Sequence, residues 1–403
     1  MRVKKEFFLI LLGMCTILTS SVLGQTSEFN HVISNSEDWR DVYSIIHYSN
    51  IIEASSDFLV STKHGVLLMP GLNKIDNYRI ISSSDKPYVL DYEKALRNNG
   101  FNVNKEISVK SANLELIEDL PDINDFIIVG NTYGYAGVAV APYALKKKAW
   151  VFFADRRNTA DILSILENRD IESLIIYGPV DREVKDSLQD LSPIIIDEGD
   201  RFKDNIKIVE EYLKISPTTQ VALTNGEFIE KSLMSGFDPI LFTGNENVPS
   251  QIADYLKNSD FTIGVLVGSD LVGAATNIRR TTGISVIVKF AQGARNPSGP
   301  IAAIEGLDLF YLTTPILKLS IHSARYNKAN SQIEITYKSD SNVPTYFQGT
   351  ISPKDERGPS SRVGDIEPIF ISPQDFKTVS YPDISLIGES LSANVFTLYG
   401  EAS

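Results

Sequence analysis

The chain has 403 residues, of which 43% are hydrophobic, and a formal net charge of −13. A chain of this length can bury the cores of two or three domains. Because the phosphates of nucleic acid repel such an acidic protein, the composition argues against a nucleic-acid partner.

The first 24 residues have the pattern of a secretory signal peptide. Basic residues among the first five precede the apolar run Phe7–Leu23, which ends in small residues before Gln25. This order predicts cleavage near Gly24 and an extracellular location at the cell surface. An uncleaved membrane anchor is the alternative, because about 17 apolar residues can just span a bilayer.

Two segments of the chain repeat with a constant spacing. Residues 162–178 align without a gap with residues 252–268, 90 positions later. Internal repeats of this size indicate that one small structural unit occurs more than once. Two flanking matches have nearly the same spacing. Residues 150–154 match residues 239–243, and residues 199–201 match residues 293–295.

A third copy precedes these two. Residues 38–46 align with residues 201–209, and the same offset places residues 58–61 on residues 221–224. We therefore predict three repeats followed by a different region, with bounds at residues 30–125, 126–200, 201–303 and 306–403.

Within each repeat, helical and extended patterns alternate. Phe202, Ile206, Val209 and Leu213 are spaced as one face of a helix. Short β-rich apolar runs predict buried parallel strands, and amphipathic helices lie between them. This alternation is typical of a Rossmann-like α/β module with a parallel sheet. Strands are expected at 126–129, 149–153, 174–177, 194–196, 221–223, 239–243, 264–267 and 285–289, and helices at 159–168, 181–190, 249–257 and 271–280.

Two stretches of the second repeat stand out. The glycine-rich segment 130–137 follows a predicted strand but has neither the Walker nor the dinucleotide-binding spacing. We interpret it as a flexible or close-packed loop. Lys146, Lys147 and Lys148 form a basic run, which is either a solvated surface or a contact for an anionic polymer.

After Gly306 the pattern changes to short β-rich runs without helices. In residues 331–337 polar and apolar side chains alternate, as in an antiparallel strand with one solvated face. The region 306–403 is therefore predicted to be an all-β, immunoglobulin-like sandwich. Strands are expected at 316–324, 332–337, 345–351, 369–371 and 393–399.

Three features of the repeats resemble a known family. Residues 199–202, Gly-Asp-Arg-Phe, open a helix, residues 239–243 form an apolar strand, and residues 265–268, Val-Leu-Val-Gly, close a strand. Together they resemble the cell-wall-binding repeat (type 2) of bacterial and archaeal surface proteins, as in clostridial surface-layer proteins. The resemblance implies three modules around a pseudo-threefold axis that hold the protein on an anionic envelope polymer without catalysis.

The residues that recur between copies are the candidates for polymer binding or for contacts between modules. Glycines at strand ends suit either a turn with positive φ or the close approach of a ligand. Arginines at helix starts could bind a carboxylate or phosphate with two hydrogen bonds, or form a salt bridge between modules. Asp200 is placed to cap a helix, and Trp39 to anchor one on the core or to stack on a sugar. The candidates are Asp38, Trp39, Arg40, Gly178, Gly199, Asp200, Arg201, Gly268, Gly293 and Arg295.

The sequence lacks a recognisable catalytic or metal-binding pattern. The four histidines are isolated, no Gly-x-Ser-x-Gly motif occurs, and the only cysteine, Cys15, lies in the predicted signal peptide. We therefore predict no enzymatic activity, no cofactor and no metal.

These patterns lead to one hypothesis and two alternatives. The hypothesis is a non-catalytic cell-surface protein that binds an anionic envelope polymer or glycan, with other surface proteins as further candidate partners. The alternatives are a soluble extracytoplasmic receptor for a small sugar or nucleotide, and a structural surface-layer subunit.

Overall fold

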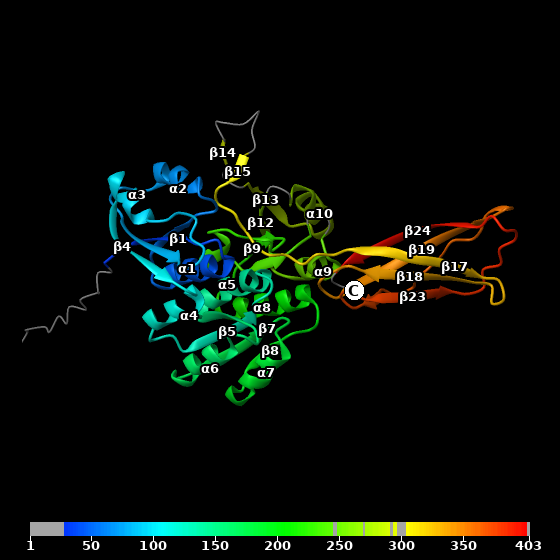
Figure 1. Cartoon of the computed structure of the whole chain (residues 1–403), viewed down its shortest axis with the longest axis horizontal. Coiled ribbons are helices and arrows are strands. Elements are labelled where there is room, and N and C mark those ends of the chain that lie inside the picture. Colours follow the sequence, from blue (N-terminus) through cyan, green and yellow to red (C-terminus); the bar gives the residue numbers. More distant parts are fainter. Residues whose placement is uncertain (1–27, 245–247, 269–270, 291–292, 296–303, 401–403) are drawn as a thin grey trace, which may run out of the picture.

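The computed structural model describes residues 28–244, 248–268, 271–290, 293–295 and 304–400, so the predicted signal peptide lies outside the described residues. The chain forms three α/β modules with parallel sheets, followed by a region of antiparallel strands (Figure 1). This confirms the predicted order of α/β modules and β region. None of the described helices is long and apolar enough to cross a membrane.

Each module contains one four-stranded parallel sheet, and the three sheets have equivalent strand orders. The orders are β2-β1-β3-β4, β6-β5-β7-β8 and β11-β9-β12-β13, so β2, β6 and β11 are equivalent edge strands. The first module contains β1 (His31–Asn35), α1 (Trp39–Ile51), β2 (Ser55–Phe58), α2 (His64–Leu67), η1 (Met69–Gly71), β3 (Asn77–Ser83), α3 (Tyr92–Asn98) and β4 (Asn102–Val109).

The second and third modules repeat this alternation of strands and helices. The second contains α4 (Ala112–Glu115), η2 (Leu116–Asp119), β5 (Asp125–Gly130), α5 (Tyr135–Lys147), β6 (Trp150–Ala154), α6 (Thr159–Glu167), β7 (Ser173–Tyr177), α7 (Arg182–Leu188), η3 (Gln189–Leu191) and β8 (Ile194–Ile196). The third contains α8 (Arg201–Ile215), β9 (Gln220–Thr224), β10 (Phe228–Ile229), η4 (Leu233–Ser235), β11 (Ile240–Phe242), α9 (Ser250–Asn258), β12 (Ile263–Val267), α10 (Val272–Thr282) and β13 (Ser285–Lys289).

Helix α5 occupies part of the segment in which a loop was expected. The helix begins inside residues 130–137, and every residue from Tyr135 to Ala144 is buried. A helix that is buried on all sides has no polar face, so it lacks the periodicity from which a helix is predicted. The loop interpretation is therefore wrong for residues 135–137.

The three modules pack together through the segments that follow the first strand of each sheet. These segments are α1, α5 and the stretch that contains β10 and η4. The Tyr43 hydroxyl of α1 donates to the Gly137 carbonyl of α5 (2.9 Å), and Asn50 of α1 donates to the Met234 carbonyl of η4 (2.7 Å). Equivalent segments of all three modules therefore meet at one centre, where α1 and α5 lie together in Figure 1.

The alignment of residues 38–46 with residues 201–209 is wrong as a structural match. Helix α1 connects β1 to β2, whereas α8 precedes β9, the first strand of its sheet. Residues 55–58 form the edge strand β2, so this part of the chain does not correspond to the central strand β9. Both segments contain a capped helix followed by an apolar strand, and this shared local pattern explains the match.

Two buried asparagines hold the edge strands of the second and third modules in the same way. Asn205 of α8 donates to the Ile240 carbonyl (2.8 Å) and accepts from the Phe242 N–H (2.7 Å) of β11. Asn113 of α4 forms the same pair of bonds with β6 (2.7 and 3.0 Å). Each side chain thus satisfies two backbone groups on the open side of an edge strand.

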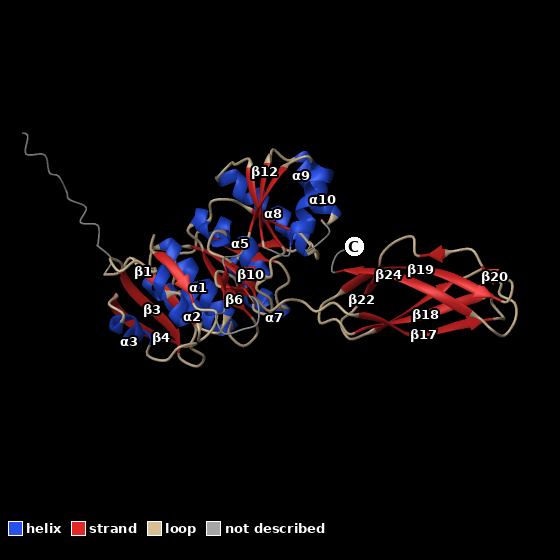
Figure 2. Ribbon diagram, turned by 90° about the horizontal axis from the view of Figure 1, so that it is seen from above, coloured by secondary structure: helices blue, strands red, loops and turns tan. Residues whose placement is uncertain are grey.

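The region after the modules is antiparallel and has a core of its own. One sheet has the order β17-β18-β23, and in the other β20, β21, β22 and β24 all pair with β19. Buried side chains such as Ile335 and Phe347 pack between the sheets, and the region forms an elongated body beside the modules (Figure 2). Its strands are β17 (Leu319–Asn327), β18 (Gln332–Ser339), β19 (Thr345–Asp355), β20 (Gly358–Pro359), β21 (Val363–Gly364), β22 (Ile369–Ile371), β23 (Phe376–Tyr381) and β24 (Ser392–Gly400).

Candidate functional site

Most of the recurring residues lie where one module meets the next. Three such junctions occur at or beside the carboxyl ends of parallel strands, the edge at which open α/β sheets bind ligands.

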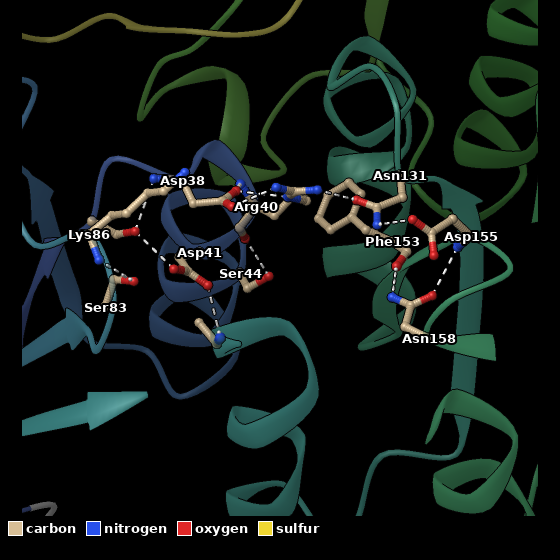
Figure 3. A network of polar contacts seen from close by, with 12 residues as sticks. Asp38, Arg40, Asp41, Ser44, Ser83, Lys86, Asn131, Phe153, Asp155 and Asn158 are labelled. Carbon is tan, nitrogen blue, oxygen red and sulfur yellow. Dashed lines mark hydrogen bonds and ion pairs between the residues drawn. The ribbon is translucent and has the colours of Figure 1, made fainter. Parts of the chain in front are cut away.

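The first junction joins the first and second modules through Asp38 and Arg40 (Figure 3). Asp38 caps α1 by accepting from the Arg40 N–H (2.9 Å), and its carboxylate also binds the guanidinium through Nε and Nη2 (2.8 and 2.6 Å). Arg40 Nη1 donates to Asn131 after β5 (2.8 Å), and Asn131 donates to Asp155 after β6 (3.0 Å). Burial acts to raise the pKa of Asp38, but the hydrogen bonds from Arg40 hold it below its usual value.

Trp39 lies in the interface beneath this network. Its side chain is only 7% exposed, and its ring centre lies 4.8 Å from that of Phe153 in β6. A sugar has no access to a ring in this position, so Trp39 anchors α1 on the second module. Because the charges and hydrogen-bonding groups of Asp38 and Arg40 are already paired with each other, the first junction is a structural contact.

The second junction is the segment 197–205, which ends the second sheet and begins α8. Asp200 caps this helix, since its Oδ1 accepts from the N–H groups of Phe202 and Lys203 (2.9 and 3.3 Å). Its Oδ2 accepts from Gln251 of α9 (3.1 Å). Gly199, with φ of +72°, forms the exposed turn before the cap. The predicted capping role of Asp200 is confirmed.

Arg201 packs against the aromatic side chains of two modules. Its guanidinium carbon lies 5.3 Å from the ring centre of Tyr135 in α5 and 4.8 Å from that of Phe202 in α8. Cation–π contacts of this kind stabilise partly buried guanidinium groups. Arg201 therefore contributes to the contact between the second and third modules.

A cleft of about 510 Å³ opens beside Arg201, between these modules and the β region. Tyr133 and Tyr135 of the second module line it with ring centres 6.1 Å apart and ring planes inclined by 14°. Tyr346 and Phe370 of the β region also line it, with ring centres 5.4 Å apart. The acidic lining residues are Asp181, Asp197, Asp200 and Asp204.

Asp204 is the most buried carboxylate of this cleft, with 1% of its surface exposed. Its Oδ1 accepts from the Glu198 N–H (2.6 Å), whereas its Oδ2 has no hydrogen-bond partner among the described residues. Burial, together with the nearby carboxylates of Asp197 and Asp200, raises the pKa of Asp204 to about 7. Asp204 thus lines the cleft with a buried carboxylate, one oxygen of which has no hydrogen-bond partner among the described residues.

We expect Asp204→Asn to stabilise the protein at pH 8 but not at pH 5. The pKa of Asp204 in the folded chain is about 7 and lies above that of an exposed aspartate, so the folded state binds more protons between about pH 4 and pH 7. Stability contributed by this group is therefore lost as the pH rises through that window. Asparagine cannot ionise and keeps the acceptor for Glu198, so the gain at pH 8 should be roughly 1–3 kcal/mol.

Urea unfolding of both proteins at the two pH values measures this difference. Asp254→Asn, at a carboxylate whose side chain is 70% exposed, is the control for removal of one charge. A gain for Asp204→Asn that is equal at pH 5 and pH 8 would contradict the expectation.

The third junction joins the third module to the first through an ion pair between Lys231 and Asp57. Lys231 binds Asp57 of β2 (2.5 Å), and the other Asp57 oxygen lies 2.9 Å from His31 Nε2. Lys289, at the end of β13, binds Glu230 (2.7 Å). A cleft of about 460 Å³ is bordered by Asp57, Glu230, Lys231 and Lys289, and the pairing of their charges makes this junction, like the first, a structural contact.

Gly178 and Gly268 lie at equivalent turns after β7 and β12. Both have positive φ, +70° and +131°, and the N–H of each donates to the last residue of the neighbouring strand, Ile196 or Lys289 (2.8 and 3.2 Å). The conformation explains glycine at both positions, because other residues rarely adopt it.

The expected role of Gly293 and Arg295 at a helix start is wrong. Residues Gly293–Arg295 form β14, which pairs antiparallel with β15 (Ile304–Gly306). The equivalent segment of the second module leads into α8, which packs on the third sheet. After β13 no further parallel sheet follows among the described residues, so a helix here would have no such surface to pack on. The short strand β16 (Phe310–Tyr311) then pairs with β10 before the β region begins.

The basic run at the end of α5 does not join the cleft. Lys147 lies 3.7 Å from Asp125, while Lys146 and Lys148 are exposed. Within the described ranges, no group of three or more histidine, cysteine, aspartate or glutamate side chains is placed to hold a metal ion.

Several cleft residues were not predicted from the sequence. Tyr346 and Phe370 belong to a different region from Arg201, and only tertiary packing brings them to the same cleft. Tyr133 and Tyr135 lie in the segment that was interpreted as a loop. The paired tyrosines directly ahead of an apolar stretch are the one local signal that could have drawn attention to this wall.

The chain has only limited similarity to known proteins. No family model matches the sequence, and no curated protein matches it. Among solved structures, Cwp6 from Clostridium difficile is 13% identical over 64% of this chain and 44% of its own, with a TM-score of 0.48. Cwp8 from Clostridium difficile is 16% identical over 63% of this chain and 47% of its own, with a TM-score of 0.49.

A β-glucosidase from Erythrobacter marinus is 11% identical, covers 70% of this chain and 45% of its own, and has a TM-score of 0.16. The chain thus spans less than half the length of each of these three proteins. At these identities and TM-scores the matches assign neither a family nor a function.

Proposed function

We propose that this chain is a non-catalytic attachment protein of the cell envelope, whose modules bind an envelope polymer or glycan. The observation that carries the proposal is the meeting of three equivalent segments, α1, α5 and the β10–η4 stretch, at one centre. This packing fixes the modules in one body, to which a chain-like ligand can bind at several places. Because linked contacts strengthen one another, even weak contacts then give firm attachment.

Two features of the sequence support the same proposal. The signal-peptide pattern of residues 1–24 predicts a location outside the cytoplasm. The repeat motifs at 199–202, 239–243 and 265–268 resemble those of cell-wall-binding repeats.

Sedimentation with isolated cell envelopes tests the proposal. The chain without its predicted signal peptide, residues 25–403, is incubated with envelopes of the source organism and centrifuged. We expect saturable recovery in the pellet, retained after protease treatment of the envelopes, because the partner is a polymer or glycan. Recovery in the supernatant at every envelope concentration, or hydrolysis of the envelope glycan, would contradict the proposal.

A receptor for a small molecule is the second candidate, and the size of the cleft favours it. Its volume of about 510 Å³ falls within the range of roughly 300–1,000 Å³ that is usual for small-molecule sites. A free monosaccharide or nucleotide that binds tightly would raise the melting temperature by mass action. A thermal-shift screen of nucleotides and neutral monosaccharides therefore separates the receptor from the attachment protein, for which we expect no shift.

A further inference from the structure

The cleft beside Arg201 has the wrong charge for an anionic polymer. Four aspartates line it, and Arg201 is the only cationic residue among the described residues of its lining. Lys185 lies nearby, but its ammonium group is bound to Asp197 (2.6 Å). The surplus of carboxylates repels phosphate or carboxylate groups and attracts cations.

Asp204 supplies the feature that points to a ligand. The side chain is buried, yet its Oδ2 has no hydrogen-bond partner within the described residues. A buried carboxylate elsewhere in the chain, Asp41, has partners for both oxygens: the Ala112 N–H (2.9 Å) and the Ser36 hydroxyl (2.8 Å). An unpaired buried acceptor costs folding free energy, and a ligand that donates to it recovers that energy.

The aromatic residues that line the cleft limit the class of ligand further. Tyr346 and Phe370 are partly or largely exposed, so a ligand in the cleft can contact their rings. Aromatic faces attract ammonium groups and pack against flat apolar surfaces. A ligand that carries an ammonium group, several hydroxyl donors and a flat carbon face would satisfy both the carboxylates and the rings.

We propose that this cleft binds an amino sugar with a free ammonium group, as one unit of a glycan chain. The ammonium group pairs with Asp204, hydroxyl groups donate to Asp181 and Asp197, and the sugar ring packs on Tyr346. A lysine side chain would supply the ammonium group alone and would bring no hydroxyl groups to Asp181 and Asp197. The inference rests on the proposed function only for the source of the glycan, which is the cell envelope.

Calorimetric titration at pH 7 with two matched tetrasaccharides tests the inference. One is a tetramer of glucosamine, and the other is the same tetramer with every amine acetylated and hence uncharged. We expect the amine form to bind at least about tenfold more tightly, since a hydrogen bond to a charged group contributes roughly 1.5–3 kcal/mol. Equal affinity for the two tetramers, or binding of neither, would overturn the inference.

Variants locate the site, and a peptide separates the ligand classes. Asp204→Asn should weaken binding of the glucosamine tetramer at least about tenfold, since it removes the charge that pairs with the ammonium group. This variant is expected to fold, because the substitution relieves a buried charge. Tyr346→Ala, which changes the wall of the cleft formed by the β region, should also weaken binding. The control Asp254→Asn should leave the affinity unchanged. An unchanged affinity of Asp204→Asn, or equally tight binding of tetralysine, would overturn the assignment.

The two proposals can fail separately. If the glucosamine tetramer binds but the protein stays in the supernatant with envelopes, the attachment function is wrong while the cleft assignment holds. If the protein sediments with envelopes and the tetramer does not bind, attachment uses another surface.

Discussion

We expect Asn205→Ala to lower the free energy of unfolding by about 2–5 kcal/mol, because two buried backbone groups then lose their partners. The side chain is fully buried and bonds both to the Ile240 carbonyl and to the Phe242 N–H of β11 (2.8 and 2.7 Å). Alanine leaves both groups unsatisfied on the open side of an edge strand. The measurement is urea unfolding followed by circular dichroism.

The control for Asn205→Ala is Asn258→Ala. Asn258 is exposed, and its amide donates only to the Asp254 carbonyl of its own helix (2.8 Å). Substitution there should change the stability by less than about 0.5 kcal/mol. If the two variants unfold at the same urea concentration, the bond to β11 does not stabilise the third module.

The second large effect is expected for Trp39→Ala, which should destabilise the chain by about 3–5 kcal/mol, as is usual for the loss of a buried tryptophan. The indole is buried between α1 and β6, with its ring edge-on to Phe153. Removing it opens a cavity in the contact between the first and second modules. Thermal unfolding and limited proteolysis of the variant measure the effect, and we expect early cleavage in the first module.

Phe237→Ala provides the matched control for an aromatic residue on the surface. Its side chain is 78% exposed, so its loss should leave the melting temperature almost unchanged. A Trp39→Ala protein that is as stable as this control but fails to bind envelopes would contradict the structural role of Trp39. It would favour the sugar-stacking interpretation instead.

The regular elements of the second and third modules could be predicted closely, because their strands are short apolar, β-rich runs separated by amphipathic helices. The expected strand at 285–289 coincides with β13, and that at 194–196 with β8. In the β region the expected strand at 369–371 coincides with β22, but the bounds of the other expected strands differ from those of the structure, and β23 was not predicted. Several strand pairings of this region are only two or three residues long, so strand ends are weakly marked in the sequence.

The equivalences between modules could not be predicted from local pattern alone. Helices α1 and α8 both begin after a capping aspartate, Asp38 or Asp200, but they occupy different places in their modules. Whether a helix comes before or after the first strand of its sheet depends on which strands pair. Strand pairing joins residues that are distant in the sequence, so a local pattern does not contain it. The buried helix α5 was missed for a related reason, since its apolar character continues around the whole helix.

The candidate site was predicted only in part. The segment 197–205 was singled out as a repeated motif, and it does line the cleft. Its chemistry depends on neighbours that are distant in the sequence, such as Tyr135 and Tyr346. The burial of Asp204 and its unpaired oxygen are properties of the packed chain, so the sequence contains no direct signal for them.

Fractionation of cells that produce this protein tests the central claim most directly. The protein should be found with the insoluble envelope fraction, and it should leave that fraction when the envelope glycan is digested. Such a result would place both the protein and its partner at the cell surface. A protein found only in the culture medium or in the cytoplasm would contradict the account.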